Sequence, residues 1–571
     1  MDKMRKIMSF FRLFFSAVLS AALLAAGIPN EFLLAGSALC GLFALVPLYT
    51  ALLQAPSFAA AGLLCGTHIA CVHLLSSFWL ANFKDFAVFT LGASTAAYFG
   101  LGISVGWCLR LLLRSSPSVR PFAFAAGWVC WEWLKSTGFL AYPWGTLPMT
   151  ASSLRFLVQI ADITGIWGLS FLFALCPAVT AELLAVPFLH RRTEASFRPE
   201  YRKTPLGAVP VSAGPAFRSR MIPAAVFLLL CAAALLYGRY ARGNLPEPEK
   251  TFRVSVIQQN SDPWTEGNAP ETALRNLQDL TRAALEDCLR TTGTKPDLVV
   301  WSETSLPYAY NINRRYYRLY PEGDSFLSFL AETGCPLFTG SPHVETENGK
   351  RKAFNAALLL NPQGEILDWY GKIQLVPFAE YMPFTEYKIV AAFFDALVGF
   401  SSGWTPGRRL TVFRIPVAGT GSAANGAGSI SFTAPICFED AFPSVTAALH
   451  NQGSGVLINL TNDSWSKTAS AEYQHFAVAR FRAVELRTTL LRVTNSGVTA
   501  VIRPDGSIQD ALPLFRPCYL NAEIPVYRTG QTVYAVYGDW FAAVCAAFSL
   551  AAMAAAVSCK KNGVSAFRGN I

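Results

Sequence analysis

The segment GSISFTAPICFEDAF, residues 428–442, places a cysteine just after an apolar run and a proline, and two residues before an acidic pair. The pattern predicts a strand that passes through a tight turn into a helix, with Cys437 at the helix N-terminus. There the helix macrodipole and a nearby lysine would lower the pKa of the thiol. Glu439 and Asp440 would oppose this unless they point away or bond neighbouring backbone. Because most free cysteines are small buried hydrophobes, the segment alone leaves Cys437 open as a nucleophile or as a core residue.

The composition of the whole chain is typical of a membrane protein. Of its 571 residues, 52% are hydrophobic and only 15% are charged, against roughly 25% charged residues in soluble domains. The net charge of +10 is compatible with nucleic acid or with anionic lipid as a partner. Since the lysines and arginines cluster beside apolar stretches, membrane lipid is favoured and no nucleic-acid partner is expected.

Eight apolar stretches have the roughly 20 residues that a membrane-spanning helix needs. They lie near residues 8–27, 31–53, 57–81, 87–110, 121–140, 156–187, 221–238 and 536–557. The sixth is long enough to contain a kink or an interfacial part. The first could instead be a signal peptide, but no convincing small-residue cleavage site precedes a soluble domain, so we expect an uncleaved helix.

The basic clusters predict how the chain is oriented. They lie near residues 3–6, 110–120, 191–220 and 560–568, and clusters of this kind mark the cytoplasmic side. If eight helices span the membrane and both termini are cytoplasmic, every basic cluster lies on the cytoplasmic side. The segment before the last helix then lies on the outer face of a bacterial cytoplasmic (inner) membrane. We therefore expect a membrane domain at 1–240 with seven helices, an extracytoplasmic domain at 241–535, and a closing eighth helix with a cytoplasmic tail at 536–571.

The segment 250–530 has the pattern of one α/β domain, in which short β-rich runs alternate with helical patterns at 269–293, 323–334 and 472–487. The 13 cysteines of the chain show no CxxC or Cys/His ligand spacing, so we expect no structural zinc site. We expect no other metal and no cofactor. A disulfide between Cys288 and Cys335 is compatible with an outward-facing domain, but the sequence does not establish it.

Three stretches of this domain carry ionisable residues near strand ends. Glu303 ends the apolar run DLVVWSETS, Lys372 and Glu380 lie in GKIQLVPFAEYMPF, and Cys437 follows. Taken singly, Glu303 could be a turn or capping residue and Lys372 a surface lysine. Together, a carboxylate base, an ammonium for an oxyanion and a thiol are what acyl transfer through a thioester requires.

These motifs, in this order, resemble the Glu-Lys-Cys triad of the nitrilase superfamily, whose fold is an α-β-β-α sandwich. The stretches LVPFAEY, NDSW and RVTNSGV, together with WEWLKSTGFLAYPWG in the apolar part, resemble the membrane branch of that superfamily, the apolipoprotein N-acyltransferase family. The resemblance covers nearly the whole chain. It therefore implies a polytopic α-helical membrane domain of eight helices joined to a nitrilase-like α/β domain.

The resemblance also implies roles for individual residues. Cys437 would be the nucleophile, Glu303 the general base and Lys372 the group that stabilises tetrahedral intermediates. The remaining expected site residues are Glu380 and Glu439, which support the triad, and the substrate-binding residues Trp264, Trp465 and Phe438, the two tryptophans lying near the entrance.

Two departures from the family pattern concern the site. The residue after the cysteine is often Tyr in the family and is Phe438 here, which removes a hydroxyl. The motif that usually reads WFG after NDS reads WSK here, at residues 465–467. The shape of this loop and its contacts with substrate can therefore differ from those of the family. Glu132, at membrane depth, is equally open as a functional group or as a structural hydrogen-bond partner.

The activity implied by the resemblance is a ping-pong transfer of a fatty acyl chain. The donor would be a membrane phospholipid, and the acceptor the α-amino group of an S-diacylglyceryl cysteine at a lipoprotein N-terminus, with no cofactor and a monomeric enzyme. Aromatic loops after Lys372 and the helix at 387–400 would touch the outer leaflet. One alternative is a membrane-tethered amidase or nitrilase; another is a transporter whose outer domain binds a ligand.

Overall fold

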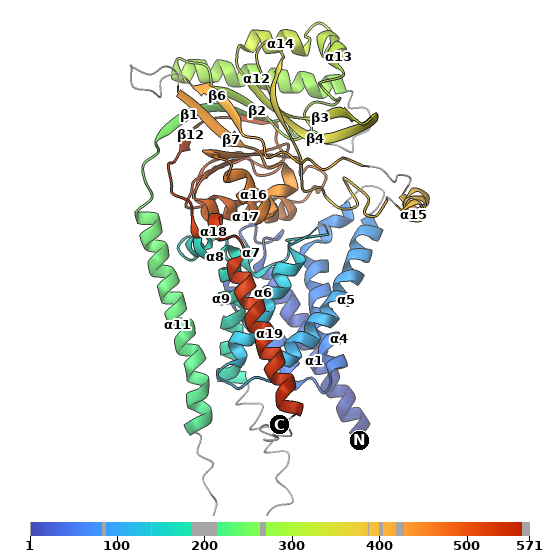
Figure 1. Cartoon of the computed structure of the whole chain (residues 1–571), viewed down its shortest axis with the longest axis vertical. Coiled ribbons are helices and arrows are strands. Elements are labelled where there is room, and N and C mark those ends of the chain that lie inside the picture. The colour runs from blue at the N-terminus through green and yellow to red at the C-terminus, as the bar shows by residue number, and fades with distance from the viewer. Residues whose placement is uncertain are drawn as a thin grey trace, which may run out of the picture.

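The computed structural model describes residues 2–82, 87–138, 140–185, 214–262, 270–385, 387–398, 403–417 and 428–561. A bundle of helices forms one half of the molecule and an α/β domain forms the other (Figure 1). The chain passes from the bundle to the α/β domain through α11 and returns through α19, so the α/β domain is inserted between the last two long apolar helices.

The bundle is built mainly from the N-terminal part of the chain. Its helices are α1 (Asp2–Gly27), α2 (Ala38–Phe43), α3 (Val46–Gln54), α4 (Phe58–Ser76), η1 (Phe78–Asn82), α5 (Ala87–Leu112), α6 (Arg120–Lys135), α7 (Leu147–Ala151), η2 (Leu157–Ile160), α8 (Ala161–Thr164), α9 (Ile166–Thr180), the π-turn η3 (Ala181–Ala185), α11 (Gly214–Gly243) and α19 (Trp540–Lys561).

Six helices among the described residues are long and apolar enough to cross a membrane, where the sequence predicted eight. The predicted span 31–53 is instead two short helices, α2 and α3, with Pro47 in the first turn of α3. The predicted span 121–140 is α6, whose 16 residues reach only about 24 Å, less than a roughly 30 Å hydrocarbon core. The break expected in the sixth stretch is present, because Gly165 adopts a positive φ of 62° between α8 and α9.

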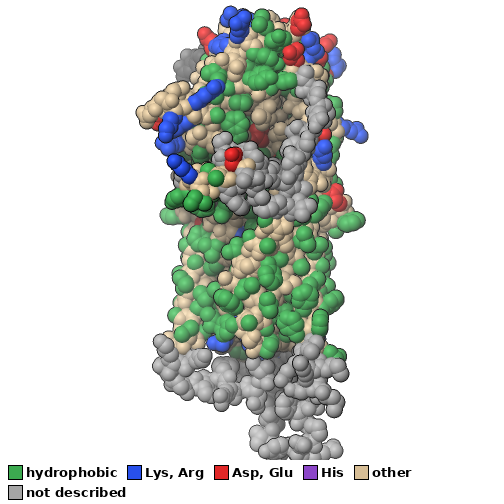
Figure 2. All heavy atoms as spheres, turned by 90° about the vertical axis from the view of Figure 1, so that its right-hand side faces the viewer, with side chains coloured by type: hydrophobic (Ala, Val, Ile, Leu, Met, Phe, Trp, Pro, Cys, Tyr) green, Lys and Arg blue, Asp and Glu red, His purple; other side chains and the backbone are tan. Residues whose placement is uncertain are grey.

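The surface of the bundle matches a lipid environment. In Figure 2 hydrophobic side chains cover the bundle on the face shown, whereas most of the charged side chains gather on the α/β domain. Exposed leucines on α11, such as Leu228, Leu229 and Leu236, point outward from the bundle. This distribution is the one expected when lipid, and not water, surrounds the helices.

The α/β domain contains two six-stranded sheets of matching topology. The first has the order β12-β1-β2-β3-β4-β5 and the second β11-β10-β9-β8-β7-β6. In each, three central strands run parallel and the outer strands pair antiparallel. The strands are β1 (Lys250–Gln258), β2 (Leu298–Trp301), β3 (Leu337–Glu347), β4 (Lys350–Leu360), β5 (Ile366–Gly371), β6 (Phe413–Val417), β7 (Gly428–Thr433), β8 (Val456–Thr461), β9 (Thr489–Thr494), β10 (Ala500–Ile502), β11 (Ile508–Ala511) and β12 (Cys518–Val526).

The two sheets pack face to face and helices cover both outer faces. Apolar side chains from both sheets, among them Phe338 and Phe432, form the core between them. The helices are α12 (Pro270–Thr292), α13 (Arg314–Leu319) and α14 (Phe326–Thr333) on the first sheet, α16 (Pro443–His450), α17 (Ala469–Leu486) and α18 (Val533–Tyr537) on the second, α15 (Lys388–Val398) at one side, and the 3-10 turn η4 (Cys437–Ala441). The expected α-β-β-α sandwich is confirmed. Cys288 and Cys335 are free buried thiols, so the disulfide considered between them is absent.

Helix α17 joins the sandwich to the bundle. The amide of Gln474 donates to the carbonyl oxygens of Pro29 and Ser76, both at 2.9 Å, and accepts from the indole of Trp79 at 3.2 Å. The hydrophobic core of the bundle continues across this contact to Phe438 and Phe442. The helical layer of the second sheet therefore rests on the bundle.

Candidate active site

Three segments that leave strands meet at one place in the sandwich. Glu303 lies two residues after β2 of the first sheet, Lys372 directly follows β5, and Cys437 begins η4 after β7 of the second sheet. Both sheets thus contribute one carboxyl end of a parallel strand, and the three predicted residues are brought together as expected.

The lysine lies between two carboxylates. The Nζ of Lys372 is 3.3 Å from Oε1 of Glu303 and 2.9 Å from Oε1 of Glu380, and the lysine side chain is 1% exposed. Although burial opposes its charge, the two carboxylates raise the pKa of Lys372 well above its usual value. Lys372 is therefore an ammonium group in the resting site.

The base candidate is fixed by further donors. The amide of Asn355 donates to Oε1 of both Glu303 and Glu380 at 2.8 Å, and the backbone N–H of Asn462 donates to Oε2 of Glu303 at 2.9 Å. Burial raises the pKa of Glu303, while Lys372 opposes this. A carboxylate whose pKa is raised is the stronger base that proton transfer from a thiol needs.

A glycine lets the Glu303 turn approach β3 closely. A Cβ at Gly340 would lie 2.3 Å from the backbone nitrogen of Thr304 and 2.6 Å from the Cα of Glu303. No side chain fits in that space, so Gly340 is required for the position of the base.

Cys437 adopts a left-handed backbone conformation, with φ 49°, which for a non-glycine residue stores strain of about 1–3 kcal/mol. The amide of Asn459 holds this turn by donating to the carbonyl oxygens of Pro435 and Cys437 at 3.1 and 3.3 Å. The Glu303 carboxylate and the Thr461 hydroxyl lie close enough to the thiol to act on its pKa, the first raising it and the second lowering it.

The expected depression of the thiol pKa is wrong. Burial raises the pKa of Cys437 well above its usual value, the charge of Glu303 raises it further, and Lys372 only partly opposes them. The helix that begins at Cys437 is a 3-10 turn of five residues, too short for a strong macrodipole. In the resting site Cys437 is therefore a protonated thiol, and the charge of the nearby Glu303 acts on it.

Both oxygens of Glu439, the first acidic residue after the cysteine, accept hydrogen bonds. Oε1 of Glu439 accepts from the hydroxyl of Tyr370 at 2.9 Å and from the N–H groups of Ile373 and Gln374 at 2.7 and 3.0 Å, and Oε2 accepts from the N–H of Ile436 at 2.7 Å. Burial raises the pKa of Glu439 to about 7, against these donors. Glu439 thus fastens the segment after Lys372 to the segment that carries Cys437.

Asp440 belongs to a buried charge cluster near Cys437. His475 of α17 lies between two carboxylates, with Nε2 2.8 Å from Asp440 and Nδ1 2.9 Å from Asp463, and Arg492 contacts the same two carboxylates at 3.4 and 2.9 Å. Both ring nitrogens face acceptors, so His475 is doubly protonated. Burial opposes this charge, but the two aspartates raise the pKa of His475 to about 9.

The chain matches two family models in the order of its two parts. A model of the apolipoprotein N-acyltransferase N-terminal domain matches residues 20–179, and a carbon-nitrogen hydrolase model matches residues 253–534. An apolipoprotein N-acyltransferase 2 of Treponema denticola is 47% identical over 93% of this chain and 95% of the relative. The chain belongs to the apolipoprotein N-acyltransferase family. An apolipoprotein N-acyltransferase 2 of Treponema pallidum is 44% identical, covering 93% of this chain and 92% of the relative, and an apolipoprotein N-acyltransferase of Borreliella burgdorferi is 31% identical, covering 93% of each chain.

The structure explains why Phe438 can stand where this family often has Tyr. The ring of Phe438 stacks on the indole of Trp144 from the bundle, with centroids 5.4 Å apart and planes 9° apart, and packs edge-on against Phe442. Phe438 is 7% exposed, and its neighbours in this stack are aromatic. Phe438 therefore packs against the bundle next to Cys437.

The two entrance tryptophans have different outcomes. Trp465 is partly buried and its ring centroid lies 5.6 Å from that of Trp79, at the contact between the sandwich and the bundle. Trp264 lies outside the described residues, so its place in the site stays a prediction.

In this family member Glu132 serves the structural role that the sequence left open. It accepts from the indole of Trp128 at 3.2 Å, the N–H of Leu147 at 2.7 Å and the hydroxyl of Ser170 at 2.5 Å. These bonds join α6, α7 and α9 at their buried faces.

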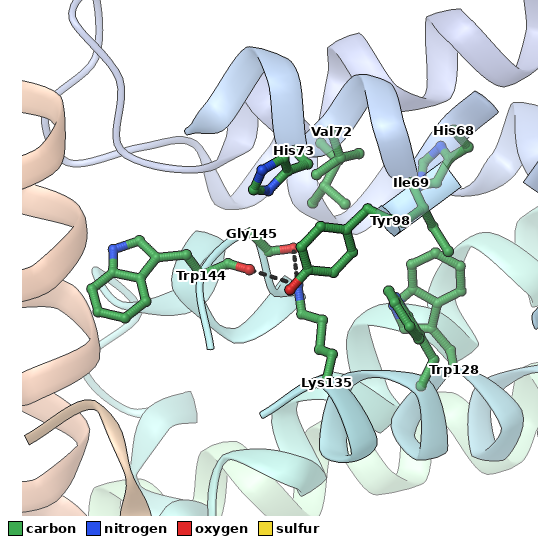
Figure 3. Close-up of a pocket in the computed structure, with 11 residues that line it drawn as sticks. His68, Ile69, Val72, His73, Tyr98, Trp128, Lys135, Trp144 and Gly145 are labelled. Atoms are coloured by element: carbon green, nitrogen blue, oxygen red, sulfur yellow. Dashed lines mark hydrogen bonds between the residues drawn. The ribbon is translucent and has the colours of Figure 1, made fainter. Parts of the chain in front are cut away.

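A small pocket lies on the bundle side of Trp144, and Figure 3 shows its lining. Lys135 reaches into it and donates to the carbonyl oxygens of Trp144 and Gly145 at 2.5 and 3.4 Å. Lys135 therefore fixes the loop that supports Phe438.

Sequence reasoning missed the residues that hold the triad in place. They are Asn355, Asn459, Asn462, Asp463, His475 and Arg492, all buried or partly buried. Their signal was present as polar letters inside or just after strands and inside the almost fully buried helix α17. Their partners lie between 12 and 159 residues away along the chain. Among the described residues no group of three or more His, Cys, Asp or Glu could hold a metal ion.

Proposed function

We propose that this chain is an apolipoprotein N-acyltransferase that moves a fatty acyl chain from a membrane phospholipid to the α-amino group of a lipoprotein's S-diacylglyceryl cysteine. The observation that carries the proposal is the ion pair of Lys372 with Glu303, whose two charges both act on the buried Cys437 thiol, where the sandwich meets the bundle. Membership of the family, with its own N-terminal domain present, supports it over a tethered amidase or a transporter.

In the first half-reaction Glu303 takes the proton of the Cys437 thiol while sulfur attacks an ester carbonyl of the phospholipid. The carbonyl oxygen becomes an oxyanion that Lys372 stabilises. The C–O bond then breaks, Glu303 returns the proton to the departing alkoxide, and a lysophospholipid leaves. The product on the enzyme is a Cys437 thioester.

In the second half-reaction the lipoprotein amine attacks the thioester carbonyl. Glu303 accepts an amine proton and Lys372 again stabilises the oxyanion. The C–S bond breaks, the amide is released, and the proton on Glu303 returns to sulfur. Because the lysophospholipid leaves and the acyl chain stays on Cys437 before the amine reacts, the kinetics are ping-pong.

Both proposed substrates are lipid-anchored, so under this proposal they approach the site from the side. Helix α15 lies at one side of the molecule, at the level of the upper ends of the bundle helices (Figure 1). Exposed Phe384 and Tyr387 precede this helix, and exposed Ile389 lies in its first turn. We assign residues 241–535 as the catalytic domain on the outer face of the bacterial inner membrane, with both termini cytoplasmic, and we take the enzyme to be a monomer.

The test is mass spectrometry of the purified protein after incubation with phospholipid vesicles. We expect a fatty acyl mass on Cys437 that disappears when a diacylglyceryl lipopeptide is added and that reappears on the lipopeptide amine. A Cys437→Ser variant that N-acylates the lipopeptide at the normal rate would disprove the mechanism. Release of ammonia from small amides, with no N-acylation, would instead indicate an amidase.

A further inference from the structure

A group of aromatic and aliphatic side chains on the surface of the sandwich has no part in the proposed reaction. The ring of Tyr308 packs edge-on against that of Tyr316, with centroids 4.8 Å apart, and Tyr316 contacts Tyr320 with centroids 5.0 Å apart. Ile312 and Leu319 belong to the same segment and are 49% and 53% exposed. We call these five residues the α13 surface. Exposed apolar side chains that gather in this way on a water-facing domain mark an interaction site.

Lipid does not account for the α13 surface. Helix α13 packs on the first sheet through the buried ring of Tyr317, whereas the helices of the second sheet rest on the bundle. The two sheets therefore lie between α13 and the bundle, and α13 is at the far end of the molecule from the bundle helices (Figure 1). Helix α15, which also has exposed apolar side chains, lies nearer the bundle. The partner of the α13 surface is therefore a molecule that lies in water or extends into it.

The segment that carries this surface begins at the catalytic base. After Glu303, the N–H of Leu306 donates to the carbonyl oxygen of Gly340 on β3 at 3.0 Å. Further on, the amide of Asn311 donates to the carbonyl oxygen of Val344 at 2.7 Å and accepts from its N–H at 3.2 Å. The segment thus follows β3 away from the base, over about 13 Å from Gly340 to Val344. A polypeptide that leaves the site along this path reaches the α13 surface.

Positive charge borders the α13 surface. Helix α13 contains three arginines and no acidic residue. Arg315 and Arg318 are exposed, and neither forms an ion pair with another of the described residues. Tyrosine and arginine are among the residues enriched where proteins bind other proteins. Arginines beside aromatic rings therefore favour a polypeptide partner that carries acidic side chains.

We propose that the α13 surface binds the polypeptide of the lipoprotein acceptor, beyond the cysteine that is acylated, with acidic side chains of that polypeptide beside Arg315 and Arg318. The inference rests on the proposed function. Of the two proposed substrates, only the acceptor has a polypeptide that must extend from the site into water, whereas the donor stays in the membrane. The row of three tyrosine rings is at most about 10 Å long, which matches about three residues of an extended chain.

The test separates the two half-reactions. Cys437 is first acylated from phospholipid in nanodiscs, and transfer of the acyl chain to three acceptors is then followed by mass spectrometry. One acceptor is S-diacylglyceryl cysteine amide, which has no polypeptide. The other two are lipopeptides of about 12 residues, long enough to pass from the base across the tyrosine row, and they carry either glutamates or lysines after the cysteine. We expect the wild-type protein to have a kcat/KM about fivefold higher with the glutamate lipopeptide than with the cysteine amide.

Substitutions on the surface test its contribution. Ile312→Ser should lower kcat/KM about fivefold for both lipopeptides and leave the cysteine amide unchanged. Arg315→Glu combined with Arg318→Glu should reverse the preference between the glutamate and lysine lipopeptides. Leu289→Ser, which changes a 50% exposed leucine of α12, is the matched control and should leave every rate unchanged. Acylation of Cys437 by phospholipid should be the same in all these variants.

The proposal is overturned if the wild-type protein has equal kcat/KM with the cysteine amide and the glutamate lipopeptide. It is also overturned if Ile312→Ser slows all three acceptors equally or slows none, or if the charge-reversed variant keeps the wild-type preference. A changed oligomeric state in these variants, with unchanged transfer, would assign the surface to contacts between copies of this chain and would overturn it too. If the wild-type protein fails to acylate Cys437, or transfers the acyl chain to none of the three acceptors, the proposed function fails, and that outcome is distinct from the others.

Discussion

Replacing His475 with glutamine tests whether the buried charge cluster near Cys437 stabilises the site. In the wild-type protein the charges of His475 and Arg492 balance those of Asp440 and Asp463. Without the imidazolium, one buried negative charge has no counter-charge, and breaking such a pair costs about 3–5 kcal/mol. The rise of the His475 pKa from 6.5 to about 9 corresponds to roughly 3 kcal/mol, so the two magnitudes agree.

The same pKa predicts how stability depends on pH. Because the folded pKa of His475 lies above the unfolded value, its stabilisation is complete below about pH 6.5 and is lost as the pH rises through about 9. We expect the melting temperature of the wild-type protein in lipid nanodiscs to fall over this range, and the fall to be smaller in His475→Gln.

Catalysis gives an independent measurement of the same cluster. The charge of Asp463 already raises the pKa of the Cys437 thiol, and an unbalanced charge would raise it more. The pH profile of Cys437 acylation in His475→Gln should therefore move to higher pH. Adding Asp440→Asn restores charge balance and should recover most of the stability. A variant with the wild-type melting temperature, pH dependence and acylation profile would refute the reasoning.

Four further substitutions test other parts of the site. Glu303→Gln removes the base and should slow Cys437 acylation by about 10²-fold or more, measured by mass spectrometry with a quenched time course. Glu439→Gln turns an amide group toward backbone donors and should lower the free energy of unfolding by about 1–3 kcal/mol; an unchanged thermal melt would contradict the role given to Glu439. Trp144→Ala removes the ring stacked on Phe438 and should cost about 3–5 kcal/mol, while Trp144→Phe should retain most of the stability in the same assay. Glu132→Gln keeps the side-chain shape and should destabilise by about 1–3 kcal/mol without abolishing acylation, whereas complete loss of activity in a folded protein would assign Glu132 a catalytic function.

The sequence predicted that Glu303, Lys372 and Cys437 come together because each follows an apolar run and has its own local signal. Glu303, Lys372 and Cys437 stand where an apolar run stops, and that position needs no knowledge of the rest of the chain. The order of the three motifs and the family resemblance then gave the sandwich. Helix α6 was predicted too long because hydropathy continues past Lys135, while the chain turns at Ser136 to let Lys135 bond the Trp144 loop.

The state of the thiol could not be predicted from local sequence. The position of Cys437 at the start of a turn suggested a lowered pKa, but burial and the charge of Glu303 act in the opposite direction. The burial of the thiol and its distance from Glu303 both depend on how the two sheets pack against each other. The residues next to Cys437 in the sequence do not determine that packing. The same holds for His475, whose two partners lie 35 and 12 residues away in the chain.

The bonds of Gln474 to the bundle have a consequence for any attempt to obtain a soluble version of the enzyme. Its amide is satisfied by carbonyl oxygens of Pro29 and Ser76, and Phe438 is covered by Trp144. If the sandwich were expressed without the bundle, the buried amide of Gln474 would lose its hydrogen-bond partners. The aromatic ring of Phe438, one residue from Cys437, would become exposed to water. Truncation would therefore damage the reaction centre itself, and biochemical work on this enzyme requires the intact chain in lipid or detergent.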